Sequence, residues 1–338
     1  MPKEALLYKK LDNNIVECGL CNHFCRIKDG QTGICGVRQN RKGVLYSLNY
    51  GKLVALHIDP IEKKPLFHFL PESNSYSIAS VGCNFKCGFC QNWQISQSVE
   101  ARRIGVDSVT VQPQEVVEEA VRSKCESISY TYTEPTIFFE FAQEVAALAN
   151  KQKLYNVFVT NGYMNSEALK LISPYLDAAN VDLKSFKESF YKEACKAHLK
   201  PVLDNIELMK KINIWVEVTT LVIPDMNDSD EELSSIASFI ASLDVGIPWH
   251  ISRFYPSYKF NNSSATEAKS LERAYEIGKS KGLRYVYIGN YYTDFGENTY
   301  CYNCSKILIE RVGFSIRLNN IKEGRCSFCG TTIEGIFK

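Results

Sequence analysis

Residues 76–290 alternate between short apolar runs and helical stretches, and this alternation constrains the fold more than any other feature. The runs are rich in β-branched and aromatic residues, and the stretches between them repeat apolar residues at helical spacing. Such alternation predicts repeated βαβ units and a parallel sheet. About six or seven units are too few for a complete eight-fold barrel. We therefore expect an α/β fold with a partial (βα)6-type barrel, whose strands lie at 77–81, 127–132, 155–160, 179–183, 215–223, 249–254 and 284–288.

The two ends of the chain lack this alternation. Residues 1–75 are irregular, with a hairpin expected around Arg41-Lys42-Gly43, and residues 296–338 read as short strands punctuated by glycine. We expect three domains: a Cys-rich N-terminal region at 1–75, the barrel at 76–295, and a zinc-ribbon-like module at 296–338. Residues 59–69 combine prolines, charges and aromatics. They are expected to lie across the barrel mouth or to form a surface linker.

Cysteine is unusually abundant, with 13 among 338 residues. The N-terminus carries no apolar signal-peptide core, and no apolar run reaches about 18 residues, so we expect a cytoplasmic protein without a membrane segment. Disulfides are rare in a reducing compartment, which favours metal or Fe–S ligation. The net charge of +1 disfavours nucleic-acid binding. Cys125 and Cys195 stand alone and are interpreted as buried structural thiols, whereas the other cysteines form three clusters.

The middle cluster consists of Cys83, Cys87 and Cys90, directly after the first expected barrel strand. Functional sites of such sheets form on the loops at the carboxyl ends of the strands. A closed zinc site needs four ligands, and an Fe–S cluster usually has four cysteine ligands. Three cysteines therefore indicate a cubane cluster with one open iron, or a zinc site that a distant histidine completes.

The two outer clusters each offer four thiolates. Two Cys-x2-Cys pairs near the C-terminus are typical of a tetrahedral zinc ribbon, with a rubredoxin-like iron site as the alternative. The N-terminal cluster fits zinc or a second Fe–S cluster equally well, and His23 is a spare ligand. The ligands are Cys301, Cys304, Cys326 and Cys329 at the C-terminus, and Cys18, Cys21, Cys25 and Cys35 at the N-terminus.

Polar residues recur at or near the carboxyl ends of the expected strands, where parallel strands bring them together. Each also has a structural interpretation. Asp182 and Lys184 share a strand face and could pair with each other, His250 could be a hydrogen-bonded core histidine, and Glu134 could begin a helix. The full set is Glu134, Asn161, Gly162, Asp182, Lys184, Glu217, Thr219 and His250.

The motif Cys83-x3-Cys87-x-Phe89-Cys90 after the first strand of a partial barrel resembles that of radical S-adenosylmethionine (SAM) enzymes. The resemblance implies a radical SAM barrel in which the three cysteines bind a [4Fe–4S] cluster and SAM chelates the fourth iron. Reductive cleavage of SAM then yields a 5′-deoxyadenosyl radical that abstracts hydrogen from a substrate. Glu134-Pro135 stands where the family usually has Gly-Gly-Glu-Pro, although this chain lacks both glycines.

The same resemblance implies roles for the residues at the strand ends. Glu134 is expected to accept from the SAM ammonium, and Asn161 and Gly162 to lie beside SAM, as does Asp182 at the barrel mouth. Glu217 and Thr219 are expected to bind the SAM ribose and carboxylate. The candidate catalytic residues are Lys184 and His250.

Longer phrases such as CGLCNHFCRIKDGQTGICGVRQN and HIDPIEKKPLFHFLPES are similar to the radical SAM member of the AmmeMemoRadiSam group, which resembles pyruvate formate-lyase activating enzymes. This implies AMMECR-type and Memo-type partner proteins and an electron donor such as ferredoxin or flavodoxin. The substrate, a small molecule or a protein residue, stays open. The alternatives are a non-catalytic Fe–S or zinc electron carrier or scaffold, and a zinc-dependent module that binds RNA or protein.

Overall fold

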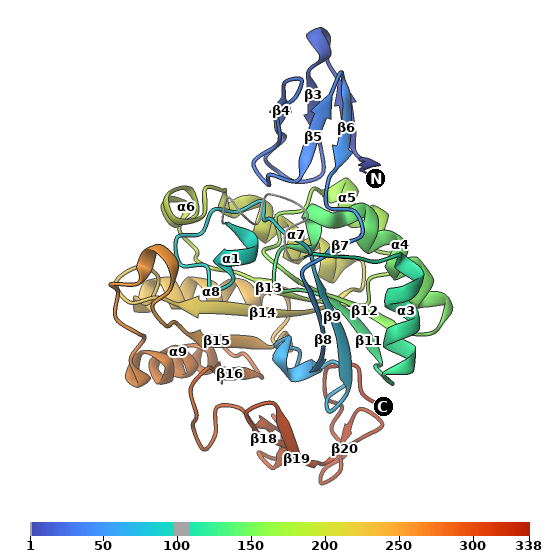
Figure 1. The fold of residues 1–338 in the computed structure, drawn as a ribbon. Coiled ribbons are helices and arrows are strands. Elements are labelled where there is room, and N and C mark those ends of the chain that lie inside the picture. The colour runs from blue at the N-terminus through green and yellow to red at the C-terminus, as the bar shows by residue number, and fades with distance from the viewer. Residues whose placement is uncertain (1, 98–107) are drawn as a thin grey trace.

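An eight-stranded sheet forms the centre of the protein (Figure 1). The computed structural model describes residues 2–97 and 108–338. Neighbouring strands of the sheet are parallel and follow chain order, except that β8 joins the edge antiparallel to β9. This confirms the predicted parallel sheet. The strands are β8 (Ala55–Pro60), β9 (Asn74–Ala79), β11 (Ser127–Tyr130), β12 (Tyr155–Thr160), β13 (Ala178–Asp182), β14 (Trp215–Val222), β15 (Trp249–Arg253) and β16 (Val286–Gly289).

Helices connect the parallel strands and lie around the outside of the curved sheet (Figure 1). Their apolar stripes pack against the strands, as at α8, where Leu233, Ile236 and Ile240 are buried. The N-cap of α8 is Ser229, whose side chain accepts from the backbone of Glu232. The connecting helices are α3 (Pro113–Arg122), α4 (Phe139–Lys151), α5 (Ser166–Ile172), α7 (Leu199–Lys211), α8 (Asp230–Leu243) and α9 (Ala268–Ser280).

Shorter helical segments lie in the connections between these elements. The segment η4 is a π-helix, a form that is rare in proteins and frequent at functional sites. The short segments are η1 (Asp12–Asn14), η2 (Ile61–Lys63), α1 (Trp93–Ser96), η3 (Pro135–Phe138), α6 (Glu188–Phe190), η4 (Tyr191–Cys195) and η5 (Tyr258–Phe260).

Two groups of short strands lie at opposite ends of the barrel (Figure 1). The predicted hairpin at Lys42 is confirmed, because β5 pairs with β6 on either side of it. The N-terminal strands are β1 (Lys3–Glu4), β2 (Tyr8–Lys10), β3 (Val16–Cys18), β4 (Arg26–Ile27), β5 (Arg38–Arg41), β6 (Val44–Ser47) and β7 (Lys52–Leu53), which pairs with β10 (Val109–Thr110). The C-terminal strands are β17 (Thr299–Tyr300), β18 (Ile307–Val312), β19 (Ser315–Asn319), β20 (Ile321–Lys322) and β21 (Arg325–Cys326).

The segment 61–70 differs from both sequence expectations. It follows β8, whose Pro60 pairs with Asn74 at the beginning of β9, so the segment lies at the amino ends of the parallel strands. It therefore closes the floor of the barrel and neither crosses the mouth nor forms a surface linker, and we call it the floor segment. Its Lys63 nevertheless reaches into the barrel and lines the same cavity as Cys83, Cys87 and Cys90. The predicted domain boundary at residue 75 falls inside the sheet, because β8 and β9 pair along their whole length.

The C-terminal strands pack directly beneath this floor segment. The buried Arg311 guanidinium donates to the backbone oxygen of Phe67 at 2.8 Å and lies 4.2 Å from the centre of its ring. Ile336 exchanges two backbone hydrogen bonds with the floor segment: its N–H donates to the His68 oxygen, and its oxygen accepts from the Leu70 N–H, both at 2.7 Å. Among the described residues, no helix is both long and apolar enough to cross a bilayer.

Candidate functional site

The loop that follows β9 carries Cys83, Cys87 and Cys90 to the carboxyl end of the sheet. Gly82 begins this loop at φ +101°, and a Cβ there would lie 2.9 Å from the Cys35 carbonyl oxygen, so only glycine fits. The backbone N–H of Phe85 donates to the Cys83 sulfur at 3.4 Å, and the Cys90 sulfur lies 3.1 Å from the Ser96 hydroxyl. The loop thus has a defined path that presents all three thiols to one cavity.

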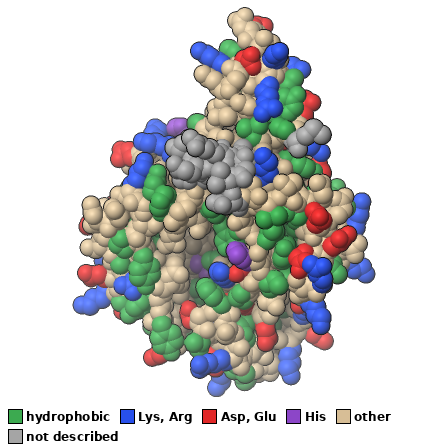
Figure 2. Space-filling view, viewed as in Figure 1, with side chains coloured by type: hydrophobic (Ala, Val, Ile, Leu, Met, Phe, Trp, Pro, Cys, Tyr) green, Lys and Arg blue, Asp and Glu red, His purple; other side chains and the backbone are tan. Residues whose placement is uncertain are grey.

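That cavity has a volume of about 340 Å³, within the range of roughly 300–1,000 Å³ usual for ligand sites. The cavity is lined by the three thiols and by side chains at the strand ends of the opposite wall. Figure 2 shows a few charged side chains near the centre of the face in view. The Thr219 hydroxyl is buried in the lining and has no hydrogen-bond partner among the described residues. This hydroxyl is therefore available to hydrogen-bond a ligand or a water molecule in the cavity.

Glu134 lies in the cavity wall and is fully engaged by the protein. It caps η3, where its Oε1 accepts from the backbone of Thr136 at 3.1 Å and from the Thr160 hydroxyl at 2.8 Å. Its Oε2 accepts from the backbone of Asn161 at 2.8 Å. Burial raises the pKa of Glu134, although these donors oppose the shift. The structure thus shows the helix-start alternative for Glu134, and the carboxylate also fixes the turn at Asn161. Its expected contact with the SAM ammonium stays a prediction.

Asn161 connects this wall to the cysteine loop. Its Nδ2 donates to Asn84 Oδ1 at 2.7 Å and lies 3.9 Å from the Cys83 sulfur. The next residue, Gly162, has φ +69°, and a Cβ there would meet Val181 at 2.8 Å. Asn161 lines the cavity, whereas Gly162 does not. The Asn161-Gly162 turn therefore positions the cysteine loop by hydrogen bonding and close packing.

Asp182 and Lys184 form the pair that their spacing suggested, with 2.7 Å between Oδ2 and Nζ. Both line the cavity. Burial lowers the pKa of Lys184, but the charge of Asp182 outweighs this and holds the pKa well above its usual range. A permanent ammonium group consequently faces the cavity beside the cysteines.

Cys195 is closer to the site than its sequence indicated. It ends the π-helix η4, its carbonyl accepts from the backbone of Lys86 at 2.8 Å, and its thiol interacts with that of Cys87. The hydrogen bond with Cys195, followed by burial, raises the pKa of Cys87 well above its usual range. A lone cysteine more than a hundred residues downstream carries no sequence signal for such a contact.

The structure argues against direct ligand contacts for Glu217 and His250, since neither lines the cavity. Glu217 is fully buried and accepts from the backbones of Phe67 at 3.0 Å and His68 at 2.8 Å, and it lies 2.6 Å from His250 Nε2. The His250 ring stacks on Tyr287. These two residues hold the floor segment, which corresponds to the core interpretation of His250. Alternation along β14 sends Glu217 and Thr219 to the same face, but two residues of strand separate the floor from the mouth.

The C-terminal cysteines converge on one point. The sulfurs of Cys301 and Cys329 are 3.6 Å apart, and those of Cys304 and Cys326 are 3.7 Å apart. Sulfurs bound at ~2.3 Å to one tetrahedral ion lie about 3.8 Å apart, so this geometry fits a closed mononuclear metal site. All four sulfurs lie within 4.8 Å of one another, and among the described residues no other set of three or more Cys, His, Asp or Glu ligands meets this criterion.

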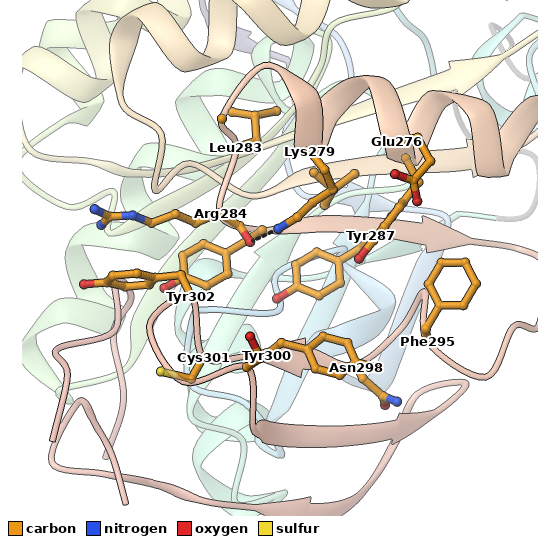
Figure 3. Close-up of a pocket in the computed structure, with 15 residues that line it drawn as sticks. Glu276, Lys279, Leu283, Arg284, Tyr287, Phe295, Asn298, Tyr300, Cys301 and Tyr302 are labelled. Atoms are coloured by element: carbon orange, nitrogen blue, oxygen red, sulfur yellow. Dashed lines mark hydrogen bonds between the residues drawn. The ribbon is translucent and has the colours of Figure 1, made fainter. Parts of the chain in front are cut away.

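A second cavity, of about 790 Å³, lies between α9, β16 and the C-terminal strands. Figure 3 shows Tyr287, Tyr300 and Tyr302 around it, with Cys301 at its edge and Lys279 donating to the carbonyl of Arg284. It shares no lining residue with the cavity at the three-cysteine loop. Its size alone does not make it the candidate site, because it lies away from the carboxyl ends of the strands.

A parallel partial barrel with three cysteines on the loop after its first parallel strand defines the class of proteins that can carry an open Fe–S cluster at the barrel mouth. Comparison with protein families gives the same assignment: residues 77–236 match the radical SAM superfamily. The chain belongs to the radical SAM superfamily. It is a radical SAM enzyme, a class that uses a [4Fe–4S] cluster to cleave SAM.

Individual relatives agree with this assignment. The chain is 46% identical over 335 residues to an uncharacterized protein of Methanocaldococcus jannaschii, covering 98% of this chain and 99% of the relative. It is 26% identical over 155 residues to the 4-hydroxyphenylacetate decarboxylase activating enzyme of Clostridium scatologenes, covering 45% of this chain and 47% of that enzyme. The crystal structure of Streptococcus suis SuiB bound to SAM has a TM-score of 0.51 and 12% identity, covering 68% and 53% of the two chains, which shows the fold.

Proposed function

We propose that Cys83, Cys87 and Cys90 hold the [4Fe–4S] cluster and that the adjoining cavity binds SAM. The observation that carries this proposal is the combination of three thiols and the unpartnered Thr219 hydroxyl in one cavity. The chemistry that the bound cluster and SAM supply is reductive cleavage of SAM, which yields methionine and a 5′-deoxyadenosyl radical that abstracts hydrogen from a substrate. The protein binds and orients these groups and keeps water away from them.

The residues at and below the strand ends have two kinds of role, contact with the ligand and positioning of other groups. Thr219 donates to or accepts from SAM, and Lys184 offers a permanent cation to a carboxylate of SAM or substrate, held in place by Asp182 at 2.7 Å. Asn161 and Glu134 are positioning residues, because their hydrogen bonds fix the cysteine loop and the turn beside it. Glu217 and His250 are positioning residues of the floor beneath the cavity.

The rest of the chain supports this barrel. The C-terminal module at 296–338 holds zinc, for which four thiols at tetrahedral spacing are the support. The N-terminal strands and the barrel form the other two units, with a boundary before β8. The flanking phrases similar to the AmmeMemoRadiSam group support AMMECR-type and Memo-type partners, and a ferredoxin or flavodoxin would supply the electron.

The substrate is a small molecule or a residue of a partner protein, from which the radical abstracts hydrogen. The names of relatives support the protein alternative, since the Clostridium scatologenes relative is an activating enzyme. A test incubates the reduced protein with SAM and each purified candidate partner, and then measures 5′-deoxyadenosine above the rate with SAM alone. Stimulation by a partner protein supports the activating role, and stimulation by small-molecule extract fractions alone contradicts it.

The decisive experiment is anaerobic reconstitution with iron, sulfide, reductant and SAM. The wild type should form 5′-deoxyadenosine, whereas Cys83→Ala should lose at least about a thousandfold in rate, because a cluster with two cysteine ligands is not retained. Cys125→Ala is the matched control, since Cys125 is a buried thiol away from the cavity. Iron content that is unchanged in Cys83→Ala, together with no 5′-deoxyadenosine from the wild type, would overturn the proposal.

A further inference from the structure

The four N-terminal cysteines line one small cavity on the barrel side of the N-terminal strands. Cys18 ends β3, and its backbone N–H donates to the Cys25 carbonyl at 2.9 Å. Cys21 forms a β-bridge with Met164, just after the Asn161-Gly162 turn. The thiols thus come from separate turns and face a common space, which is also lined by Arg38, Asn84 and Thr136.

The spacing of these thiols distinguishes between a single tetrahedral metal ion and a cubane Fe–S cluster. One tetrahedral ion needs sulfurs about 3.8 Å apart, as the C-terminal cysteines have. The four N-terminal cysteines line one cavity, but no three of their sulfurs lie within 4.8 Å of one another. The same is true of Cys83, Cys87 and Cys90. A cubane places each cysteine on a different iron, so its sulfurs lie farther apart than those around one ion.

Arg38 gives an independent sign of a ligand in this cavity. Its side chain is 1% exposed, and its Nη2 donates to Glu140 at 2.7 Å and to the Leu6 carbonyl at 2.6 Å. Its Nε and Nη1 have no hydrogen-bond partner in the described part of the chain. Because buried N–H donors are almost always satisfied, these two call for an acceptor that the protein does not provide.

Asn84 shows the same feature on the opposite side of the cavity. Its Oδ1 accepts from Asn161, whereas its Nδ2 has no hydrogen-bond partner among the described residues, although the side chain is fully buried. Bridging sulfides and cysteine sulfurs of an Fe–S cluster accept hydrogen bonds of this kind. The thiolates around a zinc ion accept such bonds as well, so these donors indicate a bound metal centre, and the wide spacing of the sulfurs favours the cluster over a single ion.

We propose that Cys18, Cys21, Cys25 and Cys35 hold a second [4Fe–4S] cluster, with Arg38 and Asn84 donating to its sulfurs. The site goes beyond the proposed SAM chemistry, because its cluster has four cysteine ligands and leaves no iron open. It lies beside the mouth cluster: the backbone oxygen of Asn84, the residue after Cys83, is 2.8 Å from His23 Nε2. Gly82 packs against Cys35.

The test uses the full chain with Cys83→Ala, Cys87→Ala and Cys90→Ala combined, which removes the mouth cluster. After anaerobic reconstitution it should retain about four irons and four sulfides per chain at this site, and a reduced-cluster EPR signal that SAM does not change. Adding Cys21→Ser and Cys25→Ser should remove both iron and signal. Iron-free triple-variant protein with an additional zinc would overturn the proposal.

The wild type provides a readout that needs no variant, with about eight cluster irons expected for two clusters and about four for one. Failure of SAM cleavage would leave the triple-variant iron count untouched, so the two proposals fail separately. In the triple variant, Arg38→Gln should also lower the midpoint potential of the remaining cluster, since it removes donors to the sulfurs. Arg26→Gln, on the exposed side of β4, is the control. An unchanged potential in Arg38→Gln would contradict the Arg38 contact.

Discussion

The cysteine groups at the two ends of the barrel differ in the spacing of their sulfurs and in the polar atoms around them. At the floor end, four thiols approach to 3.6–3.7 Å in pairs, and Cys329 is exposed, so the chain closes around a point. At the mouth, the cysteine groups are wider, and the side chains near them leave donors or hydroxyls unpartnered, as in Arg38 and Thr219. Tight sulfur spacing indicates a structural ion, whereas wide spacing, with unpartnered polar atoms lining the same cavity, indicates a larger bound group. Substitutions at the C-terminal site should therefore lower the stability of the protein without lowering its cluster iron. Substitutions of the mouth cysteines should lower the cluster iron with little effect on stability.

The largest stability effect is expected at the C-terminal metal site. Cys304→Ser should release the metal and lower the melting temperature by roughly 10 °C, because a closed metal shell supplies much of the stability of a small module. Differential scanning calorimetry and metal analysis measure this, with Ser327→Ala, between the ligands Cys326 and Cys329 of the other Cys-x2-Cys pair, as the control. Iron at the mouth should not change. Loss of cluster iron in Cys304→Ser would break the separation between floor and mouth.

Glu217→Gln should have the next largest effect, a loss of about 3 kcal/mol in the free energy of unfolding. The carboxylate accepts from Phe67, His68 and Trp215 and faces His250, and an amide cannot accept from all of them. Urea unfolding measures the change, with the exposed Glu207→Gln as the matched control. If the variant instead has wild-type stability and no longer binds SAM, Glu217 contacts SAM at the mouth, as the sequence comparison implied.

These examples show what the sequence could and could not predict. Alternation located all seven parallel strands, and the Cys-x2-Cys pairs predicted the closed C-terminal site, because both patterns are local. The depth of each residue within the barrel was not predictable. Glu217 and Thr219 share a face of β14, but the floor segment covers Glu217, and only Thr219 lines the cavity. The contact between Cys87 and Cys195 was also out of reach, because it depends on the π-helix η4.

The floor should also give the protein a pH dependence through His68. Burial lowers the pKa of His68 to about 3. In the unfolded chain the pKa of His68 is about 6.5. As the pH falls below 6.5, the unfolded chain therefore binds a proton at His68 and the folded chain does not. Folding stability is therefore full above pH 6.5 and is lost toward pH 3. Between pH 7.5 and pH 5.0 this histidine should account for about 2 kcal/mol of lost unfolding free energy.

Urea unfolding at the two pH values measures that loss in the wild type. His68→Gln should flatten the dependence by about 2 kcal/mol, since glutamine does not titrate. The exposed His57→Gln should leave the dependence as in the wild type. Equal slopes in His68→Gln and the wild type would show that His68 is already accessible to protons in the folded protein.

The smallest and sharpest test compares two neighbouring threonines on opposite faces of β14. Thr219 lines the cavity with a hydroxyl that has no partner in the described part of the chain, whereas Thr220 donates to the Leu183 carbonyl at 2.9 Å and accepts from Trp249 at 3.0 Å. Thr219→Val should weaken SAM binding about five- to tenfold and leave stability equal or slightly higher, because one ligand hydrogen bond contributes about 1 kcal/mol.

Thr220→Val should do the opposite, losing about 1–2 kcal/mol of stability by leaving two polar groups unpaired while SAM affinity is retained. Isothermal titration of SAM into the anaerobically reconstituted proteins gives the affinities, and urea unfolding gives the stabilities. Equal SAM affinities in the two variants would place Thr219 outside the ligand contacts. A vacant hydroxyl beside three thiols is the feature that distinguishes the mouth from the floor, so that result would remove the strongest evidence for ligand binding there.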